Sequence, residues 1–322
     1  MNPSVSRPTR LWKSIHKEEE VYQMKKKWTF GALVLLVFVA FVFLPSLQAV
    51  DEGVREYNQE ARRQKLRNDI AQMRAEIRAN GWDFEVDVNE AMQYSIDQLC
   101  SFKPELQPYD PDYEVCEDTI QATLPSAYTG VYTPIKNQGS CGSCWAFGTI
   151  GATEAAYKKK YGTTLDLSEQ YLVSCNTLGY GCDGGWFAFA MVKSPGAILE
   201  SCFPYKAVDA PCSYCSNPTR YKVASYGSVS TTTTSIKNAI YTYGCVAAAV
   251  YVNSYFQAYK SGTFSSCQNY SPNHAIVLCG WDDAKGAWLL KNSWGTSWGI
   301  SGFMWIKYGC CKVGYGATRC SF

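Results

Sequence analysis

The cysteine content of this chain constrains its fold more than any other feature. Fifteen cysteines occur among 322 residues, far more than proteins of the reducing cytosol usually carry. An oxidising compartment allows most of them to pair as disulfides. Because the count is odd, at least one thiol stays free or pairs with another molecule. In a disulfide-rich protein, that remaining thiol is the first place to look for reactivity.

Histidine is scarce, and this limits the chemistry that the chain can perform. The sequence has two histidines, His16 and His274, and only His274 lies beyond the hydrophobic segment described below. A zinc site built on two histidines is therefore excluded from the main domain, and any reaction there that needs an imidazole must use His274. The net charge is +2 and the C-terminal two thirds have no long basic run. We therefore predict no metal, no cofactor and no nucleic-acid partner.

An uncharged, largely apolar segment covers residues 28–50, directly after three lysines. Counted from Met1, it is long enough to span a bilayer, and the lysines would keep residues 1–27 cytoplasmic as part of a signal anchor. Counted from Met24, it has the basic start, apolar middle and small residue at Ala49 of a cleavable signal peptide. Under both interpretations the rest of the chain is exported, in agreement with the cysteine content. We therefore expect a protein that is secreted, or membrane-anchored with its main domain on the non-cytoplasmic side.

The region from 51 to 123 has a different character, being charged in its first part and rich in proline later. Apolar residues at three- and four-residue steps predict a helix over 51–80. Alternating apolar and acidic residues predict a short strand over 82–86, and Asn89 is placed to cap a second short helix that runs through Leu99. Residues 103–123, with their prolines, read as an extended linker.

From Leu124 onward, helices are expected first and strands later. A helix is predicted from Ser143 to about Tyr161, and a shorter one opens at Ser168. Strand-like runs then occupy the C-terminal half, at 246–252, 275–279, 287–290 and 303–306. This order predicts an α+β domain with a helical lobe, a sheet lobe and a cleft between them.

The string QGSCGSCWAF at 138–147 carries the most chemical information. Cys144 lies at the start of the predicted helix, where unpaired N–H groups and the helix dipole favour a thiolate, and a nearby imidazolium from His274 would favour it further. Asn292 can accept the ring N–H of that histidine and fix its orientation. Gln138 can donate its amide to a developing oxyanion, beside the backbone N–H of Cys144.

These residues resemble the papain and cathepsin family of cysteine peptidases. The match includes QGSCGSCWAF, GCDGG at 181–185, FPY at 203–205, NHA at 273–275 and NSWGTSWG at 292–299, in the family's order over most of 124–322. A redox pair or zinc knuckle is the competing interpretation of CGSC, but no βαβ context surrounds it. The resemblance implies a two-lobed papain-like α+β fold, with a helical N-terminal lobe, a β-sheet or barrel-like C-terminal lobe and the active-site cleft between them.

The resemblance also implies roles for individual residues. Cys144 is the nucleophile, His274 the acid and base, Asn292 the orienting residue and Gln138 the oxyanion donor. Substrate binding falls to Gly184, Gly185, Trp186, Asn273 and Trp294, of which Trp294 would also shield the bond between asparagine and histidine from water. Trp186 and Phe187 replace the aromatic and proline that commonly follow this glycine pair in the family. The pocket beside them is therefore expected to be reshaped and strongly apolar.

Disulfide pairing follows from the same resemblance. It joins Cys141 to Cys182, Cys175 to Cys212, and Cys267 to a cysteine among Cys310, Cys311 and Cys320. These bridges leave Cys144 unpaired. Cys202 with Cys215 is a plausible extra bridge, whereas Cys245 and Cys279 fit buried small apolar positions.

By the same resemblance, residues 124–322 form the catalytic domain of an endopeptidase that cleaves proteins or peptides, since a second histidine for an occluding loop is absent from them. Residues 51–123 are then an inhibitory propeptide and linker that block the cleft; a solvated stalk is the alternative. Acid could loosen such a segment by protonating Asp83, Glu85 and Asp87, if these are paired when docked. A catalytically silent module for surface binding is the competing function, and the four intact site residues argue against it.

Overall fold

The computed structural model describes residues 24–29, 54–115 and 123–322. The chain divides into two compact units, Met1–Leu66 and Arg67–Phe322. Residues 24–29 are helical, and the boundary between the units falls within a second helix at 54–79. The predicted signal anchor or signal peptide lies almost wholly outside the described residues. Within the described ranges, no helix is both long and apolar enough to cross a membrane.

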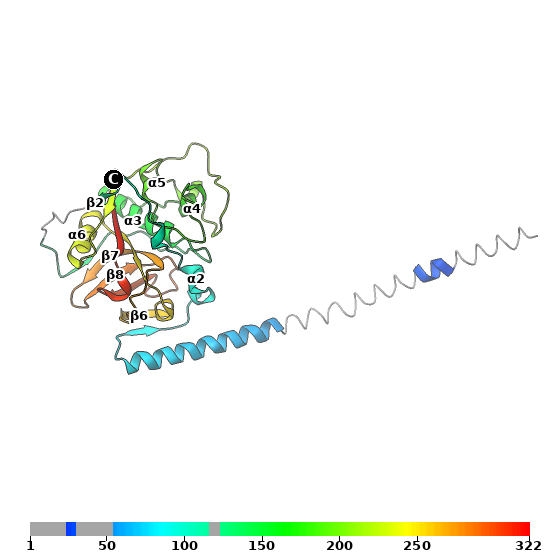
Figure 1. Cartoon of the computed structure of the whole chain (residues 1–322). Coiled ribbons are helices and arrows are strands. Elements are labelled where there is room, and N and C mark those ends of the chain that lie inside the picture. The colour runs from blue at the N-terminus through cyan, green and yellow to red at the C-terminus, as the bar shows by residue number, and fades with distance from the viewer. Residues whose placement is uncertain (1–23, 30–53, 116–122) are drawn as a thin grey trace, which may run out of the picture. The chain divides into compact units, whose positions relative to one another are not determined.

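The second unit contains mixed helices and strands (Figure 1). In chain order its elements are β1 (Phe84–Val86), η1 (Glu90–Gln93), α2 (Ile96–Leu99), η2 (Pro104–Leu106), β2 (Glu114–Val115), β3 (Ala127–Thr129), α3 (Cys144–Tyr161), α4 (Glu169–Cys175), α5 (Phe189–Lys193), η3 (Glu200–Cys202), β4 (Ser225–Ser228), α6 (Thr233–Tyr243), β5 (Val246–Val250), α7 (Ser254–Gln257), β6 (Tyr259–Phe264), β7 (His274–Asp282), β8 (Ala287–Lys291), β9 (Phe303–Lys307), η4 (Cys310–Lys312) and β10 (Tyr315–Ser321). The expected order of helices before strands holds only in part, because β3 precedes α3 and because α6 and α7 lie between strands.

One sheet joins the strands, in the order β1-β6-β9-β8-β7-β5-β10-β4-β2, with β3 paired to β7 off this path. The end strands β1 and β2 do not pair with each other, so the described sheet is open, and the barrel-like element of the prediction is not a closed barrel. Strand β7 is central and antiparallel to both neighbours, with His274 opposite Val250 of β5. This position places His274 at the start of a strand held on both sides.

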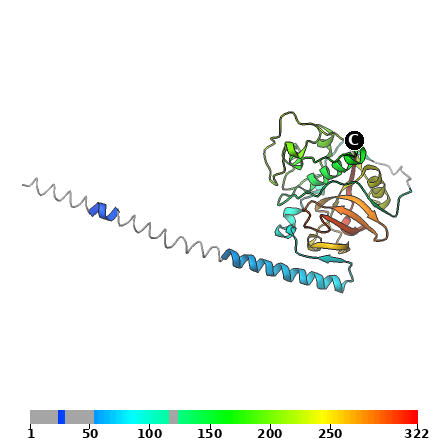
Figure 2. The same ribbon diagram turned by 180° about the vertical axis from the view of Figure 1, so that it is seen from behind.

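Two apolar cores divide the unit into a sheet lobe and a helical lobe. The sheet-lobe core includes Phe256, Trp298 and Met304, and the helical-lobe core includes Trp145 and Leu172. Helix α3 lies in the interior between the sheet and the segment that carries α4 and α5, as both ribbon views show (Figures 1 and 2). This arrangement gives the two-lobed α+β architecture that the sequence predicted.

Helix α3 is buried along most of its length, from Cys144 to Ala156, and only its end with three lysines faces water. Most of its buried residues are apolar, as expected for a helix surrounded by neighbours, and the buried Glu154 is paired with Lys136. Its glycines allow close approach to β7: a Cβ at Gly148 would lie 3.4 Å from the Cβ of Ala275, and one at Gly151 would lie 3.0 Å from Val277. This close packing brings the start of α3 next to the start of β7.

The region before the main domain is only partly as predicted. The strand over 82–86 forms as β1, which pairs with β6. The cap predicted at Asn89 is confirmed, since its side chain accepts the Ala91 amide. The single helix predicted to run through Leu99 is wrong, because the structure has a 3₁₀ turn and then α2. Ser95 causes the break, because its side chain caps α2 and makes a reciprocal capping box with Gln98. The described part of the predicted linker, residues 103–115, is extended only in part, since it contains the 3₁₀ turn η2. Its strand β2 pairs in parallel with β4, and residues 116–122 lie outside the described residues.

Candidate active site

Cys144 is the first residue of α3, and Ser143 is its N-cap. The Ser143 side chain does not cap the helix and instead shares a 2.6 Å hydrogen bond with the Tyr205 hydroxyl. That hydroxyl also donates to the backbone carbonyl of Gln138 at 2.9 Å. Tyr205 therefore fastens the Gln138 loop to the helix start. Sequence reasoning noted the FPY string but assigned this tyrosine no role.

His274 and Asn292 lie side by side in the buried centre of the molecule. Nε2 of His274 is 2.8 Å from Oδ1 of Asn292, which also accepts the Ser293 amide at 2.8 Å. The Trp294 ring lies against the imidazole, with centroids 4.8 Å apart and planes inclined by 37°. All three side chains are shielded from water, so the bond between histidine and asparagine lies in an environment that strengthens it.

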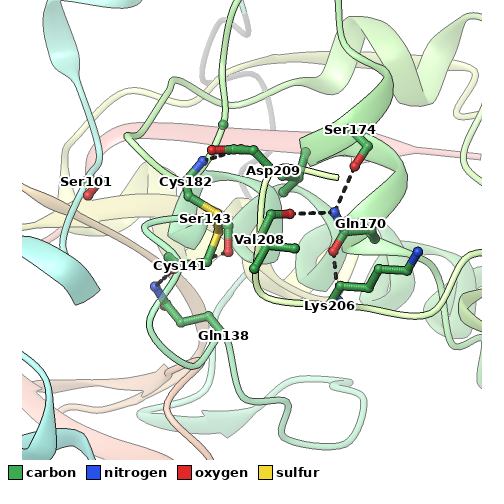
Figure 3. Close-up of a disulfide and its surroundings, with 12 residues drawn as sticks. Ser101, Gln138, Cys141, Ser143, Gln170, Ser174, Cys182, Lys206, Val208 and Asp209 are labelled. Atoms are coloured by element: carbon green, nitrogen blue, oxygen red, sulfur yellow. Dashed lines mark hydrogen bonds between the residues drawn. A yellow bond between two sulfur atoms is a disulfide. The ribbon is translucent and has the colours of Figure 1, made fainter. Parts of the chain in front are cut away.

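Gln138 is held firmly by three hydrogen bonds of its side chain. Its Nε2 donates to the carbonyls of Cys141 and Leu99, each at 2.9 Å, and its Oε1 accepts the Ser293 hydroxyl at 2.7 Å. Figure 3 shows Gln138 reaching Cys141, whose disulfide to Cys182 lies beside it. The amide is thus fixed in orientation next to the start of α3.

A charged cluster, which is largely buried except for Asp166 and which sequence reasoning missed, supports the backbone before Gln138. Lys136 makes ion pairs of 2.9 Å with Glu154 of α3, 2.8 Å with Asp166 and 3.0 Å with Glu169 of α4. The Lys136 carbonyl accepts the Gly295 amide at 3.1 Å. The cluster therefore ties α3, α4 and residues 136–138 to the segment that follows Asn292.

The Cys144 thiol lies at the meeting point of three segments. The amide of Ala275, the residue after His274, and the amide of Ser101 both approach the sulfur closely enough to lower its pKa, but burial outweighs them and raises the pKa of Cys144 to about 11. The sulfur is therefore adjacent to the first residues of β7. At neutral pH the buried thiol is protonated in this structure.

Burial acts on the imidazole in the opposite sense. It lowers the pKa of His274 to about 4, although the Asn292 hydrogen bond and the nearby Leu99 carbonyl favour the charged ring. Among the described residues, His274 Nδ1 has no hydrogen-bond partner. Both groups are consequently neutral at pH 7 in the covered site.

Residues 99–103 cover this site. The Phe102 amide donates to the Asn273 carbonyl at 2.9 Å, the Gly185 amide donates to the Ser101 carbonyl at 3.2 Å, and the Lys103 amide donates to the Gly185 carbonyl at 3.1 Å. Phe102 pairs with Gly185 in parallel. Gly184 has φ of +114°, and a Cβ there would overlap the Ser101 carbonyl, so a bare backbone is needed for this approach.

An aromatic pocket receives the Phe102 side chain. Its ring centroid lies 4.8 Å from that of Trp186 and 5.0 Å from that of Phe187, and all three residues are buried. Four of the five predicted substrate-binding residues, Gly184, Gly185, Trp186 and Asn273, thus contact residues 101–103. Trp294 is different, since it lies over the histidine instead.

The described cysteines separate into bridges and free thiols. The bridges are Cys141–Cys182, Cys175–Cys212, Cys202–Cys215 and Cys267–Cys310. The structure thereby selects Cys310 among the three C-terminal candidates. The free thiols of the described residues, all buried, are Cys100, Cys144, Cys245, Cys279, Cys311 and Cys320.

Comparison with characterised proteins gives consistent relatives. The chain is 44% identical over 193 residues to gamete and mating-type specific protein A of Dictyostelium discoideum, covering 58% of this chain and 42% of that protein. It is 38% identical over 193 residues to zingipain-2 of Zingiber officinale, covering 58% of this chain and 87% of that protein. Mouse cathepsin K is 36% identical over 204 residues, which cover 61% of each chain. The chain thus spans less than two thirds of the first and third relatives.

Solved structures of precursors share the fold. A digestive procathepsin L 3 of the Tenebrio molitor larval midgut aligns with a TM-score of 0.72 at 25% identity, covering 80% of this chain and 90% of that one. A recombinant stem bromelain precursor aligns with a TM-score of 0.70 at 28% identity, covering 86% and 99%. The family model described as papain family cysteine protease matches residues 125–319. With its sequence, its fold and its buried cysteine, histidine and asparagine in agreement, this chain belongs to the papain family of cysteine proteases.

Proposed function

We propose that this protein is a cysteine endopeptidase made as an inhibited, exported precursor, with proteins or peptides as substrates. Cys144 is the nucleophile, His274 its proton partner, Asn292 the orienting residue and Gln138 the oxyanion donor. One observation carries the proposal: the Cys144 sulfur lies at a helix start against the first residues of β7, where Asn292 holds His274 at 2.8 Å.

The reaction proceeds through an acyl-enzyme. His274 takes the proton of the Cys144 thiol, and the sulfur attacks the substrate carbonyl carbon and forms a C–S bond, while the Gln138 amide and the Cys144 N–H stabilise the developing oxyanion. His274 gives its proton to the leaving amine as the C–N bond breaks. A water molecule, deprotonated by His274, then attacks the thioester carbonyl. The C–S bond breaks, the acid leaves, and His274 returns the proton to the Cys144 sulfur. Asn292 keeps the imidazole in the orientation that these proton transfers need.

Residues 51–123, here called the prosegment, act as an intramolecular inhibitor. Three contacts support this role: the Leu99 carbonyl occupies the Gln138 amide, the Ser101 carbonyl takes the Gly185 amide, and Phe102 fills the aromatic pocket. The prosegment also buries the thiol and the imidazole, which holds both in their neutral forms. Its removal admits water and relieves the burial that opposes the thiolate and the imidazolium.

Export is proposed on independent grounds. The structure has four disulfides among the described residues, and such bridges persist in oxidising compartments. The apolar residues 28–50 follow three lysines, as in a signal peptide or signal anchor. We propose that the protein is secreted, or held on the non-cytoplasmic side of a membrane if this segment is not removed.

The hydrolysis of an internally quenched peptide library tests the proposal. Protein processed near Leu124 should cleave internal peptide bonds, whereas the Cys144→Ala and His274→Ala variants should show none of this activity. A precursor that begins at Asp51 should be far slower than the processed form. Correctly folded, processed protein without any hydrolysis would favour the silent binding module. Equal rates for both forms would favour the stalk as the role of residues 51–123.

A further inference from the structure

Cys100 is a free thiol with no part in the function proposed above. It follows α2 directly, and its amide donates to the Ile96 carbonyl at 2.7 Å. Its side chain is only 8% exposed and packs with the sheet-lobe core. It is the single cysteine of residues 54–115 and is not among the bridges. A buried, unpaired thiol in a segment that covers the active site calls for an explanation.

Both neighbours of Cys100 are fixed on the active site. The Leu99 carbonyl accepts the Gln138 amide at 2.9 Å, and the Ser101 carbonyl accepts the Gly185 amide at 3.2 Å. The Cys100 backbone is therefore held between two anchored peptide groups. It can neither slide along the cleft nor leave it while these bonds last.

The same backbone lies close to the sulfur of Cys144. The Ser101 amide approaches that sulfur and lowers its pKa, and the Cα atom of Cys100 is only two covalent bonds from this amide nitrogen. The Ser101 hydroxyl also lies where a side chain on Gly142 would have to go, beside the start of α3. After burial, the largest influence that raises the pKa of Cys100 is Cys144 itself.

We propose that Cys100 forms a disulfide with Cys144 in the precursor and so locks the prosegment covalently over the site. This inference rests on the proposed role of Cys144 as nucleophile for its consequence, but the bond itself does not require catalysis. Its formation needs the Cys100 side chain to turn about χ1, from the sheet-lobe core toward α3. A disulfide typically spans about 4.4–6.8 Å between Cα atoms, so the bond also requires the Cα atoms of Cys100 and Cys144 to come within this range.

The oxidant is a small disulfide such as oxidised glutathione. The thiolate of one cysteine attacks a glutathione sulfur, breaks the S–S bond and releases one reduced glutathione, which leaves a mixed disulfide. The second cysteine, as thiolate, then attacks the protein sulfur and releases the other glutathione. The two protons from the two thiols are carried by the two glutathione molecules. The first exchange takes place when residues 99–103 open transiently, because burial keeps both thiols protonated when they are covered.

The other described free thiols have different surroundings. The Cys245 thiol donates to the Val131 carbonyl at 3.0 Å, Cys311 lies 3.5 Å from the Ser266 carbonyl, and the Cys320 sulfur is 4.0 Å from the Thr153 hydroxyl. These contacts belong to the packed interiors of the lobes. The Cys279 sulfur lies 3.9 Å from the Val277 carbonyl within β7. Among the other free thiols of the described ranges, Cys100 is the one whose neighbour, Ser101, approaches the Cys144 sulfur with its amide.

Non-reducing peptide mapping of the precursor tests the inference. Precursor equilibrated in buffers of reduced and oxidised glutathione, then quenched in acid, should yield a linked peptide that contains Cys100 and Cys144. The Cys116→Ser variant, which removes the other cysteine of the prosegment, should yield the same linked peptide. The Cys100→Ser variant should lack it.

Activity provides the second measurement. After the linker is cut by an added serine protease, which is then inhibited, oxidised wild type should show at least tenfold less hydrolysis than the same sample treated with dithiothreitol. The Cys100→Ser precursor should show much less dependence on the reductant. If the linked peptide is found but the protein stays inactive after reduction, the disulfide is confirmed and the proposed function is overturned. Precursor with its structural bridges formed but only glutathione on Cys144, or a link from Cys116 to Cys144, would overturn the inference.

Discussion

The side-chain amide of Gln138 donates a 2.9 Å hydrogen bond to the backbone carbonyl of Leu99. This amide is the group proposed to stabilise the oxyanion of the substrate. In this structure its hydrogen bond goes instead to a carbonyl of the prosegment. Oxyanion donors act because they are oriented before the reaction begins. The bonds from Gln138 to Cys141 and Ser293 supply that orientation independently of the prosegment, so the amide stays in place when Leu99 leaves.

Replacement of this amide should affect catalysis far more than binding. In processed protein, Gln138→Ala should lower kcat by about 10²–10³, because removal of one oxyanion donor has an effect of this size in other hydrolases. KM should change little. Steady-state kinetics on a peptide substrate give both constants. The matched control is Gln170→Ala, which removes a buried glutamine bonded to Val208 and Ser174; an equal loss of kcat in the control would contradict the assigned role.

The aromatic side chain of Phe102 should contribute strongly to inhibition. Truncation of a buried phenylalanine typically costs about 3–5 kcal/mol, and here the lost contacts are those with Trp186 and Phe187. Phe102→Ala precursor should therefore react with a thiol-directed epoxide at least about 100-fold faster than wild type. The exposed Tyr109, changed to Ala, serves as control. An unchanged rate for Phe102→Ala would show that the pocket contributes nothing to the block.

Asp87 should make prosegment docking sensitive to acid. Its hydrogen bond with Lys260 of β6 is the main influence that lowers the pKa of this carboxyl, and Arg74 adds to it. Because the pKa is lower when docked, the charged form stabilises docking above the ordinary carboxyl pKa of about 4. That contribution is lost as the pH falls through the lowered value.

Asp87→Asn should therefore weaken docking at neutral pH and leave its affinity less dependent on pH between about 5 and 3. The rate of epoxide labelling of Cys144 in the precursor, followed across this range, measures the effect. Glu105→Gln, at an exposed position of η2, is the charge-matched control. A labelling profile for Asp87→Asn that coincides with wild type at every pH would eliminate this contact as an acid sensor.

Tyr205 should support the site through its hydroxyl. Tyr205→Phe removes the hydrogen bonds to Ser143 and to the Gln138 carbonyl and should lower the free energy of unfolding by about 1–3 kcal/mol, since partners are left unsatisfied in a buried place. Urea unfolding measures the change. The same substitution at exposed Tyr270 should fall within about 0.5 kcal/mol of wild type. A loss at Tyr205 no larger than at Tyr270 would refute the support role.

The local parts of this molecule could be predicted from its sequence. Helix α3 starts within the cysteine string. The strands β7 and β8 were predicted from apolar runs, of which the first directly follows His274 and the second lies just before Asn292. The meeting of His274 with Asn292 was a hypothesis from their chemistry and from family resemblance, because eighteen residues separate them and only the pairing of β7 with β8 brings them together. Tyr205 and Lys136 were missed for the same reason, since their partners lie on distant segments.

The prosegment was harder to predict. The break between η1 and α2 depends on Ser95 and Gln98, a short capping signal inside a stretch whose composition favours a helix. The pairing of Glu114–Val115 with β4 had no pattern of its own, because two residues are too few to show alternation. The occupation of the cleft by Ser101 and Phe102 depends on contacts with Gly185 and Trp186 that only the folded domain provides.

The rate of carboxamidomethylation of each thiol in processed protein tests the central claim most directly. Iodoacetamide under native conditions, with labelled cysteines identified by peptide mapping, should modify Cys144 at least about tenfold faster than any other free thiol. The reason is the proposed proton sharing between this sulfur and His274 at a helix start, once the prosegment has been removed. His274→Ala should abolish that advantage. Equal, slow labelling of all free thiols in wild type, or fast labelling of Cys144 that survives the loss of His274, would contradict the account.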